Sequence, residues 1–199
     1  MASKVSQSWE DFLNPDVIRP RLIAASVFIS GFELLKDSII GRISDFLADG
    51  FDRSGPILGS RYKAEVLSRN KSPVYASLSW LRERDVVDDH DLAAFERAKA
   101  CRNTLAHRLF SALGVEGLPP DFGQCFNDML AVLRKIEVWW IANVEIPTDP
   151  DYDGEEINEN RIAPGPVMAM RLLVDIALGD EEQSRSYYDA FRKHAQGGN

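Results

Sequence analysis

The stretch that most constrains the fold runs from Asp88 to Gly114 and has the repeat of an amphipathic helix. Apolar residues recur in it at steps of three and four, which places them on one face of a helix. These residues are Leu92, Phe95, Ala98, Cys101, Leu105, Leu109 and Ala112. Asp88 is a suitable N-cap residue, and Gly114 suits the position just after a last turn. The pattern predicts one continuous helix over this range.

The rest of the chain is also predicted to be helical, because no segment alternates apolar and polar residues as a strand would. Further helices are predicted over 6–13, 20–49, 61–68, 73–85, 121–144, 167–178 and 180–194, with loops over 50–60 and 147–165. We therefore expect an all-α helical bundle with a C-terminal helical extension. The expected organisation is a helical domain over 1–145, an acidic loop over 146–165, and a helical hairpin over 166–199 packed on the same domain.

Composition narrows the class of protein. Hydrophobic residues make up 45% of the 199 residues and charged residues 27%, which is the balance of a globular chain. The net charge of −8 argues against a general nucleic-acid coat, although it leaves room for a small basic pocket. No segment resembles a secretory signal or a membrane span, so we expect a cytoplasmic protein with no membrane partner. Cys101 and Cys125 lie in apolar helical patterns and are expected to be buried thiols.

Arg102 lies within the apolar face of the predicted helix, where its neighbours one turn away include Ala98, Leu105 and Ala106. Its guanidinium keeps its charge at any physiological pH, because its pKa is above ~12. A charge in such surroundings needs a counter-ion. The sequence therefore predicts that Arg102 meets either an anionic ligand or a carboxylate of the protein such as Glu33.

The run from Arg102 to His107, RNTLAH, resembles the R-N-x-x-x-H motif of the HEPN superfamily of ribonucleases. The run from Glu33 to Lys36, ELLK, is similar to an E-x-x-K stretch on the first long helix of such domains. The resemblance implies a HEPN-like bundle that acts as a homodimer, with its cleft at the dimer seam. It also implies a metal-independent endoribonuclease, cytoplasmic, in a toxin–antitoxin or antiviral-defence setting, with RNA as substrate and an antitoxin or defence protein as a further partner.

The chemistry would be attack of a ribose 2′-hydroxyl on the adjacent phosphate, which needs a base, an acid and a cation. Under the resemblance Arg102 binds the phosphate, His107 transfers protons, and Asn103 orients His107 or contacts the ribose. Asn103 and His107 are four residues apart and share a helix face. Arg102 and His107 lie about 140° apart around a helix, so they meet one ligand only if the helix bends or Arg102 reaches around it. No metal or cofactor is expected.

Three further cations flank this motif and are expected to form a substrate-binding rim: Lys99, Arg97 and Arg108. The alternative is a non-catalytic HEPN-like dimeric module that binds a nucleotide, RNA or protein partner. In the plainest interpretation Arg102 pairs with Glu33 and His107 is structural. Leu109 stands two positions after His107, where toxins regulated by adenylylation carry Tyr, so that form of regulation is not expected.

The segment from Asp149 to Gly154, DPDYDG, resembles the start of a calcium loop. The twelfth position, which should be a bidentate Glu, is Asn160. We therefore expect an acidic loop facing solvent. The alternative is a divalent-ion site with Asp149, Asp151 and Asp153 as ligands.

Overall fold

The computed structural model describes residues 4–154 and 156–197. In this part of the chain nearly all regular structure is helical, and one two-stranded hairpin is the exception. The predicted all-α class is therefore confirmed. None of the helices in the described ranges combines the length and the apolar character that a membrane span requires.

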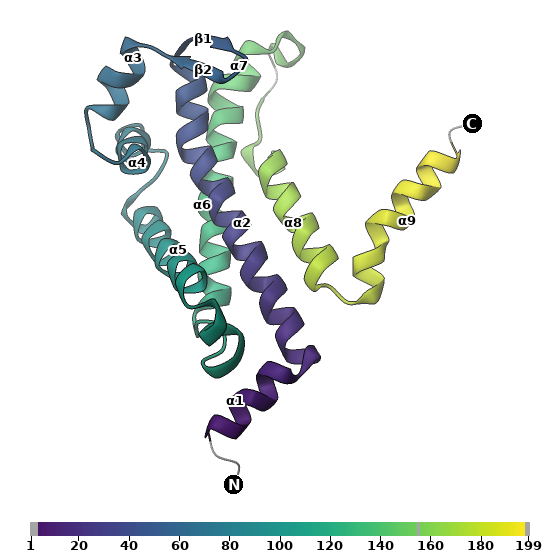
Figure 1. Cartoon of the computed structure of the whole chain (residues 1–199). Helices are drawn as coiled ribbons and strands as arrows, with labels where there is room; N and C mark the ends of the chain where they lie inside the picture. The colour runs from purple at the N-terminus through teal and green to yellow at the C-terminus, as the bar shows by residue number, and fades with distance from the viewer. Residues whose placement is uncertain (1–3, 155, 198–199) are drawn as a thin grey trace.

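Five helices form the body of the molecule, and Figure 1 shows the two longest, α2 and α6, side by side along its axis. Helices α4 and α5 lie on one side of this pair, and α8 lies on the other. The bounds are α2 (Pro15–Phe46), α4 (Pro73–Glu83), α5 (Asp89–His107), α6 (Phe122–Trp140) and α8 (Gly165–Leu178). Their apolar faces meet in one core that includes Phe28, Leu35, Trp80, Phe95, Leu105 and Leu133.

Helix α2 begins five residues before the predicted start at Pro20 and ends at Phe46 rather than at residue 49. Asn14 caps it by accepting a hydrogen bond from the backbone N–H of Asp16, and Pro15 occupies the first turn. These two residues make a stronger start signal than Pro20, which lies on the exposed side of the second turn. The position is tolerable because solvent can reach the carbonyl that Pro20 leaves without a partner.

The hairpin contradicts the loop predicted over residues 50–60. Strand β1 (Ala48–Asp52) pairs antiparallel with β2 (Gly55–Leu58), with Asp52 opposite Gly55 at the turn. The turn forms because the backbone N–H of Ser54 donates to the Asp52 carboxylate at 2.7 Å and Gly55 adopts a φ of +118°. The strands carry two glycines and a proline and hardly alternate, so the sequence has no clear strand signal.

Helix α5 ends at His107, so the continuous helix predicted as far as Gly114 is wrong. Arg108 leaves the helical conformation with φ −126° and ψ 31°, and a π-helical turn follows over Ser111–Val115. The guanidinium of Arg21 on α2 donates to the carbonyls of Leu113 and Gly114 at 2.9 and 3.3 Å. The break is thus held by a contact from far away in the sequence, which helical periodicity cannot report.

Short elements complete the chain. The segment predicted over 61–68 is α3 (Ser60–Tyr62) followed by a π-helical turn, and α6 continues through another such turn into α7 (Ile146–Thr148). Helix α1 (Lys4–Leu13) packs on the π-helical turn that follows α5. Helix α9 (Glu181–Gly197) contacts α8 and projects away from the bundle, as Figure 1 shows. Of the predicted C-terminal hairpin, then, α8 packs on α2 and α6, and α9 extends from it as an arm.

Candidate functional site

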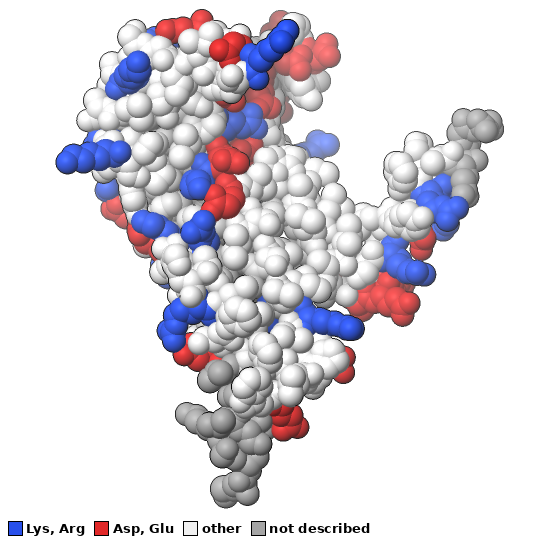
Figure 2. Space-filling model, viewed as in Figure 1, with Lys and Arg blue, Asp and Glu red and all other residues white. Residues whose placement is uncertain are grey.

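Arg102 of α5 faces Glu33 of α2 across the seam between these helices. Its Nη2 lies 2.7 Å from the Glu33 Oε1, and the two side chains are 31% and 38% exposed. Figure 2 shows charged side chains of both signs gathered over this seam, beside a wide uncharged area over α2 and α8. The counter-ion of Arg102 is therefore the carboxylate considered in the sequence analysis, but the pair is open to solvent.

Lys36 and Asn103 join the pair of Arg102 and Glu33 to form a cluster of four polar residues. Lys36, one turn after Glu33, donates to its other carboxylate oxygen. Asn103 accepts a hydrogen bond through its Oδ1 from Arg102 Nη1 at 3.3 Å. The ammonium of Lys36, followed by the guanidinium of Arg102, holds the pKa of Glu33 below its usual range, so this carboxylate stays ionised at neutral pH. The E-x-x-K and R-N stretches thus meet in space.

An aromatic layer lies beneath the cluster. The rings of Phe32 and Phe95 stack with centroids 5.6 Å apart, and the Arg102 guanidinium lies 5.9 Å from the Phe32 centroid. The Nε–H of Arg102 is buried and has no hydrogen-bond partner among the described residues. This layer fixes the base of the Arg102 side chain and leaves its outer nitrogens at the surface.

His107 lies apart from this cluster. It is the last residue of α5 and is exposed, and its ring has no hydrogen-bond partner in the described part of the chain. The expected contact between Asn103 and His107 is replaced by the hydrogen bond from Arg102 to Asn103. Since α5 is regular up to His107, nothing bends Arg102 and His107 onto one face. One chain therefore does not bring all three motif residues together.

The predicted rim is divided between two sides of α5. Lys99 precedes Arg102 by three residues and lies on its side of the helix. Its ammonium donates to the Tyr75 hydroxyl at 2.5 Å, and that hydroxyl donates to Glu96, also at 2.5 Å. The hydrogen bond to Tyr75 raises the pKa of Lys99. Tyr75 comes from α4, and sequence analysis missed it because no local pattern links it to α5.

Arg97 and Arg108 lie on the other side of α5, so they do not form a rim around Arg102. Arg97 pairs with Asp128 and Arg108 with Glu116, each at 2.7 Å. Both arginines line a pocket of about 350 Å³ between α5 and the loop at 116–121. Arg97 precedes Arg102 by five residues and therefore points well away from it on a helix of 3.6 residues per turn. Arg108 follows the last residue of α5 and is held by Glu116 in the next loop.

The acidic loop does not assemble the alternative cation site. Asp149 accepts a hydrogen bond from the backbone N–H of Asp151 in a local turn, and Asp149, Asp151 and Asp153 are exposed. Among the described residues, these three carboxylates do not converge as a group of candidate metal ligands. Residue 155, within the calcium-loop pattern, lies outside the described residues.

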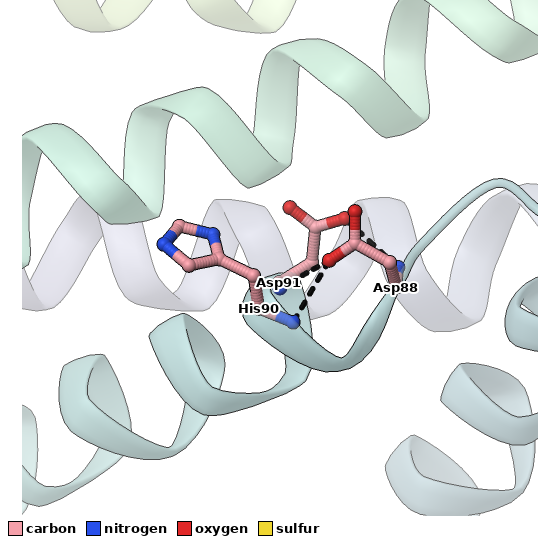
Figure 3. A group of neighbouring side chains, drawn as sticks. All are labelled: Asp88, His90 and Asp91. Carbon is pink, nitrogen blue, oxygen red and sulfur yellow. Dashed lines mark hydrogen bonds between the residues drawn. The ribbon is translucent and has the colours of Figure 1, made fainter.

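A different trio has side-chain ligand atoms within 4.8 Å of one another: Asp88, His90 and Asp91. Figure 3 shows that the hydrogen bonds among them join carboxylates to backbone N–H groups, which is the pattern of a capping box. The ammonium of Lys135 on α6 donates to both carboxylates. This cluster is accounted for by the start of α5 and its attachment to α6, and Lys135 already supplies the cation.

Comparison with protein-family models, with curated proteins and with solved structures found no match for this chain.

Proposed function

We propose that this protein is a metal-independent endoribonuclease of the HEPN type, acting in the cytoplasm on RNA. The observation that carries the proposal is the meeting of Glu33 and Lys36 from α2 with Arg102 and Asn103 from α5 at a solvent-open seam. The two stretches on which the resemblance depends lie 69 residues apart in the chain. Their assembly into one cluster is expected of an active site and is not required by helical packing alone.

In this proposal Arg102 binds the scissile phosphate. Its Nη2 and Nη1 hold Glu33 and Asn103, and the remaining outer N–H groups are free to donate to phosphate oxygens. Glu33 and Lys36 position the guanidinium. The permanent positive charge would stabilise the negative charge that develops on phosphorus during attack by the 2′-hydroxyl.

His107 would transfer protons, and a second copy of the chain would bring it to the phosphate. Imidazole has an ordinary pKa near ~6.5 and suits both proton roles at neutral pH. Because His107 lies around the helix from Arg102, a homodimer with its cleft along α5 would allow Arg102 of one copy to act with His107 of the other. A toxin or phage-defence setting, with a protein inhibitor, belongs to this proposal through the resemblance alone.

The test is cleavage of single-stranded RNA by the purified protein in EDTA. We expect products with 2′,3′-cyclic phosphate ends, and we expect both Arg102→Ala and His107→Ala to reduce the rate by at least ~100-fold. His90→Ala is the matched control, because His90 is an exposed histidine at the other end of α5. Thermal unfolding of His107→Ala and His90→Ala should match the wild type, and Arg102→Ala should lose no more than about 1 kcal/mol with its surface ion pair. Undiminished cleavage by His107→Ala would exclude the assignment.

A second candidate is a non-catalytic dimeric module that binds a nucleotide, RNA or a protein. The neutralisation of Arg102 by Glu33 favours it, because a guanidinium with a permanent partner has less charge to offer a transition state. In the same assay this candidate predicts RNA retention without new cyclic ends. It also predicts that His107→Ala leaves that retention unchanged.

A further inference from the structure

Helix α9 presents an apolar face that the described part of the chain covers only in part. Tyr187, Tyr188 and Phe191 recur at the spacing of one helical face and are 41%, 61% and 71% exposed. The Tyr187 hydroxyl donates to Asp175 of α8 at 2.7 Å, which ties the first turns of α9 to α8. Beyond this contact with α8, helix α9 points away from the bundle (Figure 1). An isolated helix of about 15 residues is marginal in water, so this arm needs a partner.

The charges of α9 indicate which partner. Glu181 and Glu182 lie in its first turn, and Arg192 and Lys193 lie near its C-terminal end. An antiparallel copy of the same helix places the acidic turn of each copy beside the basic turn of the other. The described helix carries three acids and three bases, with Arg185 and Asp189 completing the set. An arm with no net positive charge has little attraction for an anionic membrane or for RNA.

The available area also suits a second copy. On α8, Met168, Leu173 and Ile176 are 46% to 49% exposed and lie within about 140° of one another around the helix, whereas Leu178 lies on another side. With the three aromatic residues of α9, six side chains of each copy can contribute to the contact. If each loses roughly 80 Å² of exposed surface, two copies bury on the order of 1,000 Å², which is the lower end for a specific interface.

We propose that α9 pairs antiparallel with α9 of a second copy about a two-fold axis close to Tyr187 and Tyr188, with α8 of each copy flanking the pair. The interface is isologous, since the same residues serve both copies. Phe191 of each copy then packs near Ser184 of the other, where the small side chain leaves room for the ring. The inference does not depend on the nuclease proposal, because it uses neither Arg102 nor His107.

The first test measures the dimer dissociation constant by sedimentation equilibrium of the full chain. We expect self-association through α9, in addition to any pairing along α5 that the nuclease proposal requires. The double variant Tyr188→Glu, Phe191→Glu should raise the dissociation constant of the α9 pair by at least about 100-fold. Ser186→Glu is the matched control for either single change, because it adds one negative charge on the side of α9 opposite Tyr188 and should leave the constant unchanged. A monomeric wild type, or self-association that the double variant leaves unchanged, would overturn this interface.

The second test uses charge reversal to establish the antiparallel direction. One double variant, Glu181→Lys with Glu182→Lys, should raise the dissociation constant about tenfold. The other double variant, Arg192→Glu with Lys193→Glu, should raise it by a similar factor. All four changes in one chain restore opposite charges across an antiparallel pair and should recover most of the affinity. Far-UV circular dichroism checks that α9 stays helical. If the variant with all four changes dimerises no more tightly than either double variant, the antiparallel arrangement is wrong. RNA cleavage is measured separately, so either proposal can fail without the other.

Discussion

The guanidinium of Arg102 on α5 lies 2.7 Å from the carboxylate of Glu33 on α2, and Lys36 holds the second oxygen of that carboxylate. Two cations therefore share one anion at a surface seam. Such a cluster has an excess of positive charge at its outer side, even though the chain as a whole has a net charge of −8. This local excess is the reason why we propose phosphate as the ligand of the seam.

Glu33→Gln tests whether the ion pair positions Arg102. Because both partners are about one third exposed, we expect the free energy of unfolding to fall by no more than about 1 kcal/mol. We expect kcat for RNA cleavage to fall about tenfold, because a displaced guanidinium meets the phosphate less well. Glu65→Gln is the control, since Glu65 is equally exposed and pairs with Arg61 away from the seam. An unchanged kcat would show that Glu33 has no part in positioning Arg102.

Arg42→Met tests the ion pair between Arg42 of α2 and the buried carboxylate of Glu137 on α6. Glu137 is 1% exposed and accepts hydrogen bonds from Ser38 and from Arg42 Nη2, both at 2.6 Å. Loss of Arg42 leaves this carboxylate buried with one neutral partner, and we expect destabilisation of about 2–4 kcal/mol in urea unfolding. Adding Glu137→Leu should recover part of the loss, because no buried charge then remains. Destabilisation below about 1 kcal/mol in Arg42→Met would contradict this account.

The carboxylate of Asp88 predicts how the stability of the fold changes at acidic pH. The backbone N–H of Asp91, followed by the ammonium of Lys135, lowers the pKa of Asp88 from an ordinary 3.8 to about 2. A carboxylate with a lowered pKa in the folded state stabilises the fold above about pH 4, and this stabilisation is lost as the pH falls toward 2. Asn can still cap the helix, but it cannot pair with Lys135. The difference in urea midpoint between wild type and Asp88→Asn should therefore shrink between pH 4 and pH 2. A difference that is constant over this range would be the contrary result.

Cys101 and Cys125 should be unreactive in the folded protein. Burial is the main cause that raises the pKa of Cys101 to about 12, and it also raises the pKa of Cys125. Since the thiolate is the reactive form, the raised pKa keeps Cys101 almost entirely as the unreactive thiol at pH 8. Mass spectrometry after iodoacetamide treatment should find both thiols unmodified in the native protein and both modified in urea. Rapid modification of Cys101 without unfolding would contradict its burial.

Local signals in the sequence were sufficient for much of the helical layout. Helix α4 starts at Pro73, where the helix over 73–85 was predicted to begin, and Asp88 caps α5 as predicted. Residues predicted to face the core on α5, including Phe95, Ala98 and Leu105, are buried. These features depend on residues within one or two turns of each other, and a single sequence reports that range well.

The amino-acid sequence by itself determined that this chain is helical, where most helices lie, and which residues carry the R-N-x-x-x-H pattern. Only the tertiary structure decided that Arg102 meets Glu33, that Arg97 and Arg108 face away from it, and that Arg21 holds the break after His107. It also turned Asn103 toward Arg102 instead of His107. The physical reason is range: caps and periodicity act within a few residues, whereas ion pairs form between side chains that packing brings together from anywhere in the chain.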